Sequence, residues 1–220
     1  VGTGAGRDAD GGGGMGMGIG RGTGGLGIDA GKHDVIFSNA ALHWCEDHRT
    51  LLPSLLTLLK SNGGILALQM PDTVSQPSHQ LMETAAFRSG ALDALRDVRI
   101  PRVEKSPHWY YELLSPLTRN VEMWTTEYAQ MLPTDAPNYA DWHETNGRLH
   151  PVLEFTRSTG LRPILEALGG EESMLCQAYL REYDRLLRDA YKPILVHNKY
   201  VNNKYFTLFP MKRFFLLARM

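Results

Sequence analysis

A short segment of polar and aromatic residues follows directly after an apolar run early in the sequence. The residues of this segment that can contact a ligand are Asn39, Ala40, Leu42, His43 and Trp44. Open α/β sheets bind small molecules where their parallel strands end, so we predict a ligand site here. Two alternatives stay open, because Asn39 can be a turn residue that bonds its own backbone and Trp44 can be a core residue.

Metal and redox chemistry find little support in the residue types. Cys45 and Cys176 are the only cysteines and lack C-x-x-C spacing, and His43 has no partner ligand at helical spacing. We therefore predict no metal site and a reducing, cytoplasmic compartment.

The charge and hydropathy pattern limits the possible partners. The formal net charge is −1, which gives no general attraction to nucleic acid or to an acidic membrane. No apolar run reaches the roughly 20 residues of a transmembrane helix, and no signal peptide is visible. We predict a small-molecule ligand without nucleic-acid or membrane partners, and the sequence leaves the oligomeric state open.

A predicted strand–helix–strand unit positions the segment that starts at Asn39. Residues 35–37 form a short apolar run typical of a buried strand, and leucines at helical spacing follow at 51–59. Ser-Asn-Gly-Gly at 61–64 ends the helix, and 65–70 form a second apolar strand. This order predicts parallel strands with a right-handed crossover in an α/β fold.

The rest of the chain is predicted to be helical, with further strands mainly near the end. Helices are expected at 78–96, 137–146, 150–168 and 171–190, and strands at 120–131, 205–208 and 213–218. The last two strands are separated by Pro-Met-Lys at 210–212. We expect them to form an antiparallel hairpin that completes the sheet.

The first 31 residues contain fifteen of the 22 glycines and almost no apolar periodicity. Such a segment buries too little surface to offset its ordering entropy, so residues 1–32 are predicted to be disordered and 33–220 to form the domain. Gly20, Gly22 and Gly25 match a G-x-G-x-x-G pattern. No strand precedes the match and no amphipathic helix follows it, so we do not interpret it as a phosphate-binding loop.

Several motifs occur in a fixed order along residues 33–220. They lie at 34–44, at 63–72 with the ending Gln-Met-Pro-Asp, at 124–128, at 141–142, at 159–163 with Gly-Leu-Arg-Pro, and at 209–219. In this order they resemble the trans-aconitate 2-methyltransferase family of class I S-adenosylmethionine-dependent methyltransferases. The resemblance implies a Rossmann-like α/β fold with a helical substrate-lid region.

The resemblance also implies the cofactor S-adenosyl-L-methionine and the formation of a methyl ester on a small carboxylate such as trans-aconitate. On this basis Asn39, Ala40 and Leu42 are expected to form the floor beneath the methionine part of the cofactor. His43 and Trp44 are expected to close the pocket between cofactor and substrate.

Four further residues are substrate-binding candidates under the same resemblance. Arg162 would bind a carboxylate, Tyr110 and Tyr111 would donate hydroxyls, and Trp142 would line the lid. A surface role for Arg162 and a core role for the tyrosines stay open. The basic residues within 96–105 are interpreted as a solvated face.

Two features depart from the family pattern. Residues 1–33 do not encode the family's first strands and cofactor turn, so we expect an N-terminally truncated domain. Residues 142–158 are longer than the family's link between the motifs at 141–142 and 159–163.

The alternative to an enzyme is a non-catalytic remnant with an interaction or regulatory role. A nicotinamide-dependent oxidoreductase has less support, because the glycine-rich run lacks its strand and helix. Truncation would expose strand 34–38 as an edge, so we expect poor solubility or dimerisation.

Overall fold

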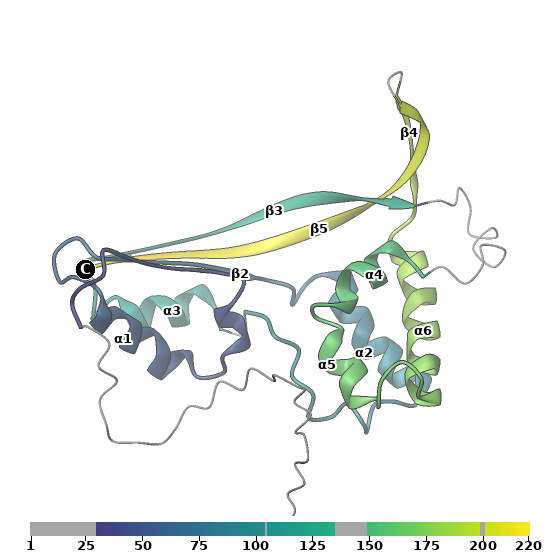
Figure 1. Ribbon diagram of the computed structural model, residues 1–220, viewed down its shortest axis with the longest axis horizontal. Coiled ribbons are helices and arrows are strands. Elements are labelled where there is room, and N and C mark those ends of the chain that lie inside the picture. Colours follow the sequence, from purple (N-terminus) through teal and green to yellow (C-terminus); the bar gives the residue numbers. More distant parts are fainter. Residues whose placement is uncertain (1–29, 104, 135–148, 199–200) are drawn as a thin grey trace, which may run out of the picture.

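The computed structural model describes residues 30–103, 105–134, 149–198 and 201–220 (Figure 1). Its strands are β1 (Val35–Asn39), β2 (Ile65–Pro71), β3 (Asn120–Thr134), β4 (Ile194–Asn198) and β5 (Val201–Arg219). Its helices are η1 (Leu42–Trp44, a 3-10 turn), α1 (His48–Leu58), α2 (Pro77–Ser89), α3 (Pro107–Leu114), α4 (Pro151–Arg157), α5 (Arg162–Ala167) and α6 (Met174–Ala190). None of the helices in these ranges is long and apolar enough to cross a membrane.

The strands form one mixed sheet in the order β1-β2-β5-β3, and β4 pairs with β5 beside this path. β1 and β2 are parallel and are joined through α1, which confirms the predicted strand–helix–strand unit. β5 is antiparallel to β2, β3 and β4. The carboxyl ends of β1 and β2 therefore lie side by side, and both lead into the loops that build the candidate site.

Two hydrophobic clusters divide the described chain into a sheet lobe and a helical lobe. In the sheet lobe, α1 and α3 pack on one face of the sheet, where Leu52, Leu66 and Tyr110 are fully buried (Figure 1). In the helical lobe, α2, α4, α5 and α6 surround a second core with Tyr179 and Tyr183. The long β3–β5 ribbon runs from one lobe to the other (Figure 1).

The predicted hairpin between strands 205–208 and 213–218 is wrong, because β5 is one continuous strand. Pro210 does not break it. The Pro210 carbonyl accepts a hydrogen bond from Gln76 Nε2 at 2.7 Å, on the side away from β3. The nitrogen and carbonyl of a strand residue point to the same side, so the missing N–H of Pro210 does not weaken the β3 ladder.

Two predicted helices differ in extent. The helix expected over 78–96 ends at Ser89, because Gly90 adopts a left-handed φ of 75°. The helix expected over 150–168 is divided into α4 and α5. At this break Gly160 lies so close to helix α2 that an added Cβ would be 2.8 Å from His79 Nε2, so a larger residue there would require the His79 side chain to move.

The other predictions for the chain have mixed outcomes. The strand at 120–131 and the helix at 171–190 are present as β3 and α6, and the candidate residues Tyr110 and Tyr111 lie in a further helix, α3. The helix predicted over 137–146 lies outside the described residues. So does almost all of the predicted glycine-rich segment 1–32, of which the structure describes residues 30–32.

Candidate functional site

The backbone turns sharply where β1 ends. Ala40 has a φ of 49°, which lies in the left-handed region that residues with a Cβ seldom adopt. Its amide donates a hydrogen bond to the carbonyl of Gln69 at 2.9 Å, which ties the turn to β2. Strained backbone of this kind is concentrated at ligand sites and needs surrounding contacts to persist.

Side chains from three other segments hold the following turn, η1. Arg99 donates to the carbonyls of His43 at 2.9 Å and Trp44 at 3.2 Å. His48 Nε2 donates to the Leu42 carbonyl at 2.8 Å. Because that carbonyl can only accept, His48 Nδ1 accepts the hydrogen bond from the Tyr110 hydroxyl, also at 2.8 Å.

A cavity of about 180 Å³ lies beside η1, between the two lobes, and we call it the inter-lobe cavity. Its walls come from the loops after β1 and β2, from α2, from α4 and the turn after it, and from the middle of β5. The lining residues are Ala40, His43, Trp44, Pro71, Thr73, Gln76, His79, Pro101, Phe155, Thr156, Thr159, Gly160, Phe209, Met211, Lys212 and Arg213.

Two polar atoms in the wall of the inter-lobe cavity are buried without a hydrogen-bond partner among the described residues. They are His43 Nδ1 and Thr73 Oγ1. Leaving a buried polar atom unpaired is costly, so a hydrogen-bond partner for either atom would be stabilising.

The histidines of this cavity are uncharged at neutral pH. The pKa of His43 is lowered to about 4, mainly by burial and with smaller contributions from the charges of Arg213 and Arg99. Burial also lowers the pKa of His79 to about 4, with a smaller contribution from Arg102. The positive charge at this cavity therefore comes from Lys212 and Arg213, and Lys212 is paired with Asp72 at 2.9 Å.

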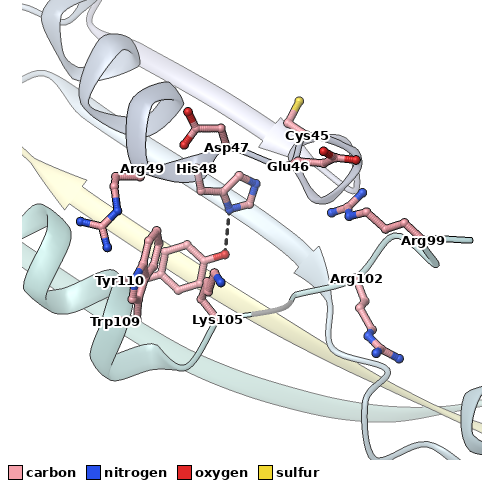
Figure 2. A pocket seen from close by; sticks show the side chains of 10 residues that line it. All are labelled: Cys45, Glu46, Asp47, His48, Arg49, Arg99, Arg102, Lys105, Trp109 and Tyr110. Atoms are coloured by element: carbon pink, nitrogen blue, oxygen red, sulfur yellow. Dashed lines mark hydrogen bonds between the residues drawn. The ribbon is translucent and has the colours of Figure 1, made fainter. Parts of the chain in front are cut away.

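The next residues of the same loop line a second hollow of about 330 Å³, which we call the basic cavity (Figure 2). It shares no lining residue with the inter-lobe cavity. Its lining residues are Cys45, Glu46, Asp47, His48, Arg49, Arg99, Arg102, Lys105, Trp109 and Tyr110. No group of three or more His, Cys, Asp and Glu in the described ranges is arranged to hold a metal ion.

The structure brings together part of the cofactor and substrate set proposed from the sequence. Ala40, His43 and Trp44 line the inter-lobe cavity. Asn39 is exposed at the end of β1, and Leu42 is half-buried against the core of the sheet lobe. Three of the five residues therefore line the inter-lobe cavity, and Asn39 and Leu42 do not.

The remaining candidates lie apart from the inter-lobe cavity. Tyr110 is fully buried and lines the basic cavity, and Tyr111 is half exposed on α3. Arg162 is an exposed residue of α5 whose Nε is 2.8 Å from Glu166 Oε1, although Thr159 and Gly160 just before it line the inter-lobe cavity. Trp142 lies outside the described residues.

Sequence reasoning did not assign the cationic lining of the basic cavity. Arg99, Arg102 and Lys105 were visible as a basic cluster, but local sequence does not distinguish a cavity wall from a solvated face. Arg49 lies some 50 residues before them, in α1, and only the fold brings it close. The sequence signal for this cavity was the presence of three basic residues within the seven positions 99–105.

Comparison with known proteins gives a consistent set of relatives. A trans-aconitate 2-methyltransferase from Azoarcus sp. (strain BH72) is 38% identical over 187 residues, which cover 84% of this chain and 62% of the relative. One from Methylobacterium radiotolerans is 37% identical over 164 residues, 73% of this chain and 56% of the relative. No protein-family model matches the chain. In the comparison with solved structures, the YcgJ protein from Bacillus subtilis is 16% identical with a TM-score of 0.36. The match covers 89% of this chain and 68% of the YcgJ chain.

These sequence relatives are methyltransferases by name, and they match most of the described chain. Over most of its length the chain is similar to trans-aconitate 2-methyltransferases, which agrees with the resemblance seen in its motifs. It spans about three-fifths of the length of the curated relatives it matches. Their names give no support to the alternative of a non-catalytic remnant.

Proposed function

We propose that this protein takes part in the transfer of a methyl group from S-adenosyl-L-methionine to a carboxylate oxygen of a small carboxylic acid such as trans-aconitate. The names of the relatives support the reaction class and the substrate. The structural observation that supports it most directly is the unpaired Nδ1 of a neutral, buried His43 beside a cavity at the carboxyl ends of β1 and β2.

The residues at the end of β1 fit the methionine part of the cofactor. The exposed amide of Asn39 can exchange hydrogen bonds with an amino-acid group, and Ala40 and Leu42 offer apolar contacts. The cofactor's sulfonium carries a positive charge and supplies the methyl group. Because the pKa of His43 is lowered to about 4, its imidazole does not repel that charge at pH 7.

The proposed reaction needs positioning rather than proton transfer. The carboxylate oxygen forms a bond to the methyl carbon while the carbon–sulfur bond breaks and its electrons remain on sulfur. Carboxylic acids are ionised at pH 7, so no general base is required. The protein's task is to align the two reacting atoms and to hold the substrate's charge.

The substrate-binding part of the proposal combines cavity residues and more distant ones. His43 and Trp44 would contact the substrate in the inter-lobe cavity, where Arg213 adds a cation. Arg162, Tyr110, Tyr111 and Trp142 remain proposed substrate residues. To bind the substrate, the Arg162 guanidinium must leave Glu166. Their ion pair is exposed, so breaking it costs little free energy.

A binding and turnover experiment tests the proposal. We expect S-adenosyl-L-methionine to bind the chain in calorimetry, and mass spectrometry to detect a methyl ester after addition of trans-aconitate. Asn39→Ala should weaken cofactor binding, whereas Asn120→Ala, at the exposed start of β3, should not. Absence of both cofactor binding and ester would overturn the proposal.

The same assay addresses the substrate residues. Arg162→Ala should raise the KM for trans-aconitate sharply, while the matched change Arg181→Ala on the exposed side of α6 leaves it unchanged. An unchanged KM in Arg162→Ala would remove this residue from the site.

A further inference from the structure

The basic cavity collects cations from three separate segments. Arg49 comes from the first turn of α1, Arg99 and Arg102 from the segment before α3, and Lys105 from just before the Ser106 N-cap of α3. Figure 2 shows Arg49, Lys105 and Trp109 on one side of the hollow and Arg99 and Arg102 on the other. The two carboxylates of the lining, Glu46 and Asp47, leave a surplus of positive charge.

Three of these cations have no carboxylate within ion-pair distance among the described residues. They are Arg49, Arg102 and Lys105. Asp47 accepts a hydrogen bond from the Thr50 amide as the N-cap of α1, and this contact lowers the pKa of its carboxyl. Like charges around one hollow repel each other, and an anion between them would relieve that repulsion.

Trp109 arranges two of the cations over its ring. Arg49 Cζ lies 5.6 Å and Lys105 Nζ 6.0 Å from the ring centroid, within the range of cation–π contacts. The amino ends of α1 and α3 also face this region, so their free N–H groups add to the positive potential. The floor is rigid, because Tyr110 and His48 are hydrogen-bonded and buried.

We propose that the basic cavity binds a small anion that carries several carboxylate or phosphate groups, with Arg49, Arg102 and Lys105 as its main contacts. Guanidinium forks and a lysine ammonium are the side chains that recognise such oxyanions. The site adjoins the inter-lobe cavity through residues 43–48 but is lined by different side chains. It does not depend on methyl transfer, since binding needs neither cofactor nor turnover.

Calorimetry with two probes tests the site on the full chain without cofactor. Tricarballylate supplies three carboxylates, pyrophosphate supplies phosphates, and acetate serves as the monovalent comparison. We expect saturable binding of at least one multivalent probe, weakening as salt is added, and no saturation by acetate at the same concentrations. Tighter binding of tricarballylate would identify a carboxylate ligand, and tighter binding of pyrophosphate a phosphate ligand.

Charge-removing variants locate the binding. Arg102→Gln and Lys105→Gln should each weaken the probe by about tenfold, the loss expected for one charge-assisted hydrogen bond. Arg96→Gln is the matched control, because Arg96 pairs with Asp93 in the same basic segment and does not line the basic cavity. No saturable binding of either probe, or equal weakening by Arg96→Gln and Arg102→Gln, would overturn the site.

Discussion

The Tyr110 hydroxyl connects three elements through two hydrogen bonds. It donates to His48 Nδ1, and His48 Nε2 donates to the Leu42 carbonyl, each at 2.8 Å. The chain thus links α3 to the start of α1 and to η1, which carries His43 and Trp44. Both Tyr110 and His48 are buried, so water cannot readily replace a lost bond.

Replacing Tyr110 with Phe removes only this hydroxyl, so the change should loosen η1 without leaving a large cavity. We expect Tyr110→Phe to lower the free energy of unfolding by about 1–3 kcal/mol, because His48 Nδ1 is left buried and unpaired. Urea denaturation measures the loss. Tyr111→Phe is the control, because Tyr111 is half exposed on the same helix and should change stability by less than about 0.5 kcal/mol. Equal losses in the two variants would contradict the role of the hydrogen bond.

Single residues also define how far the sequence could predict the site. The segment from Asn39 to Trp44 could be placed at a strand end, because an apolar run followed by polar residues is a local signal. The left-handed φ of Ala40 carries no such signal, since alanine is ordinary at most backbone positions. Arg49 and Arg102 line the same cavity because a helix packs near a distant loop. No local sequence pattern predicts this packing.

At the scale of elements, the start of α4 depends on a neutral histidine. His150 Nδ1 accepts a hydrogen bond from the Val152 amide at 3.2 Å, and its Nε2 donates to the Tyr191 carbonyl at 3.1 Å. Burial lowers the pKa of His150 to about 4, although the Tyr191 carbonyl and Asp184 act in the opposite direction. The charge of Arg188 makes a smaller contribution to this pKa in the same direction as burial. Protonation would remove the acceptor that caps the helix.

This cap should make stability sensitive to acid. The folded pKa of about 4 lies below the ordinary 6.5, so the unfolded chain binds the proton first and stability is lost as pH falls from 6.5 to 4. We expect His150→Asn, which can still cap, to flatten the pH dependence of the unfolding free energy in that window. Part of the pH dependence of the unfolding free energy should remain in this variant, because the pKa values of His43 and His79 are also about 4.

Urea denaturation of both proteins at several pH values between 4 and 7.5 measures the difference. Above pH 6.5 the variant should be less stable by about 1–3 kcal/mol, because the bond from His150 Nε2 to the Tyr191 carbonyl is lost while the cap is kept. Parallel curves through the acidic window would show that His150 does not titrate there.

Elements also show where local patterns mislead. Pro210 suggested a break between two strands, yet its nitrogen faces away from the β3 ladder and β5 continues through it. The apolar periodicity of 150–168 predicted one helix, whereas the chain forms two, α4 and α5, with Gly160 close to His79 at the break. Both positions contact residues at the start of α2, Gln76 at its N-cap and His79 in its first turn, some 80 or more residues earlier in the chain.

At the scale of the whole molecule, the described helices cover only one face of the sheet at the end where β1 and β2 lie. The described helices α1 and α3 both pack on the face that bears Leu66 and Leu68 (Figure 1). Paired strand residues share a face, and the register aligns Phe37 with Ala67 and Leu217 on the other side. Trp124 and Phe215 stack there with centroids 5.1 Å apart, so each of the four strands contributes an apolar side chain to this face, beside the ion pair of Glu122 and Arg219.

This open face should drive self-association of the chain. β1 is an edge strand within the described sheet, and Val35 and Phe37 are 55% and 71% exposed, so a second copy can cover both the edge and the apolar side chains. We expect sedimentation equilibrium to show association that increases with concentration, and Phe37→Glu to reduce it by about tenfold or more, since a charge opposes burial. Phe87→Glu is the control, because Phe87 is equally exposed, at 72%, but lies on α2 in the helical lobe. A monomer at every concentration, or equal effects of the two substitutions, would show that the open face does not mediate association.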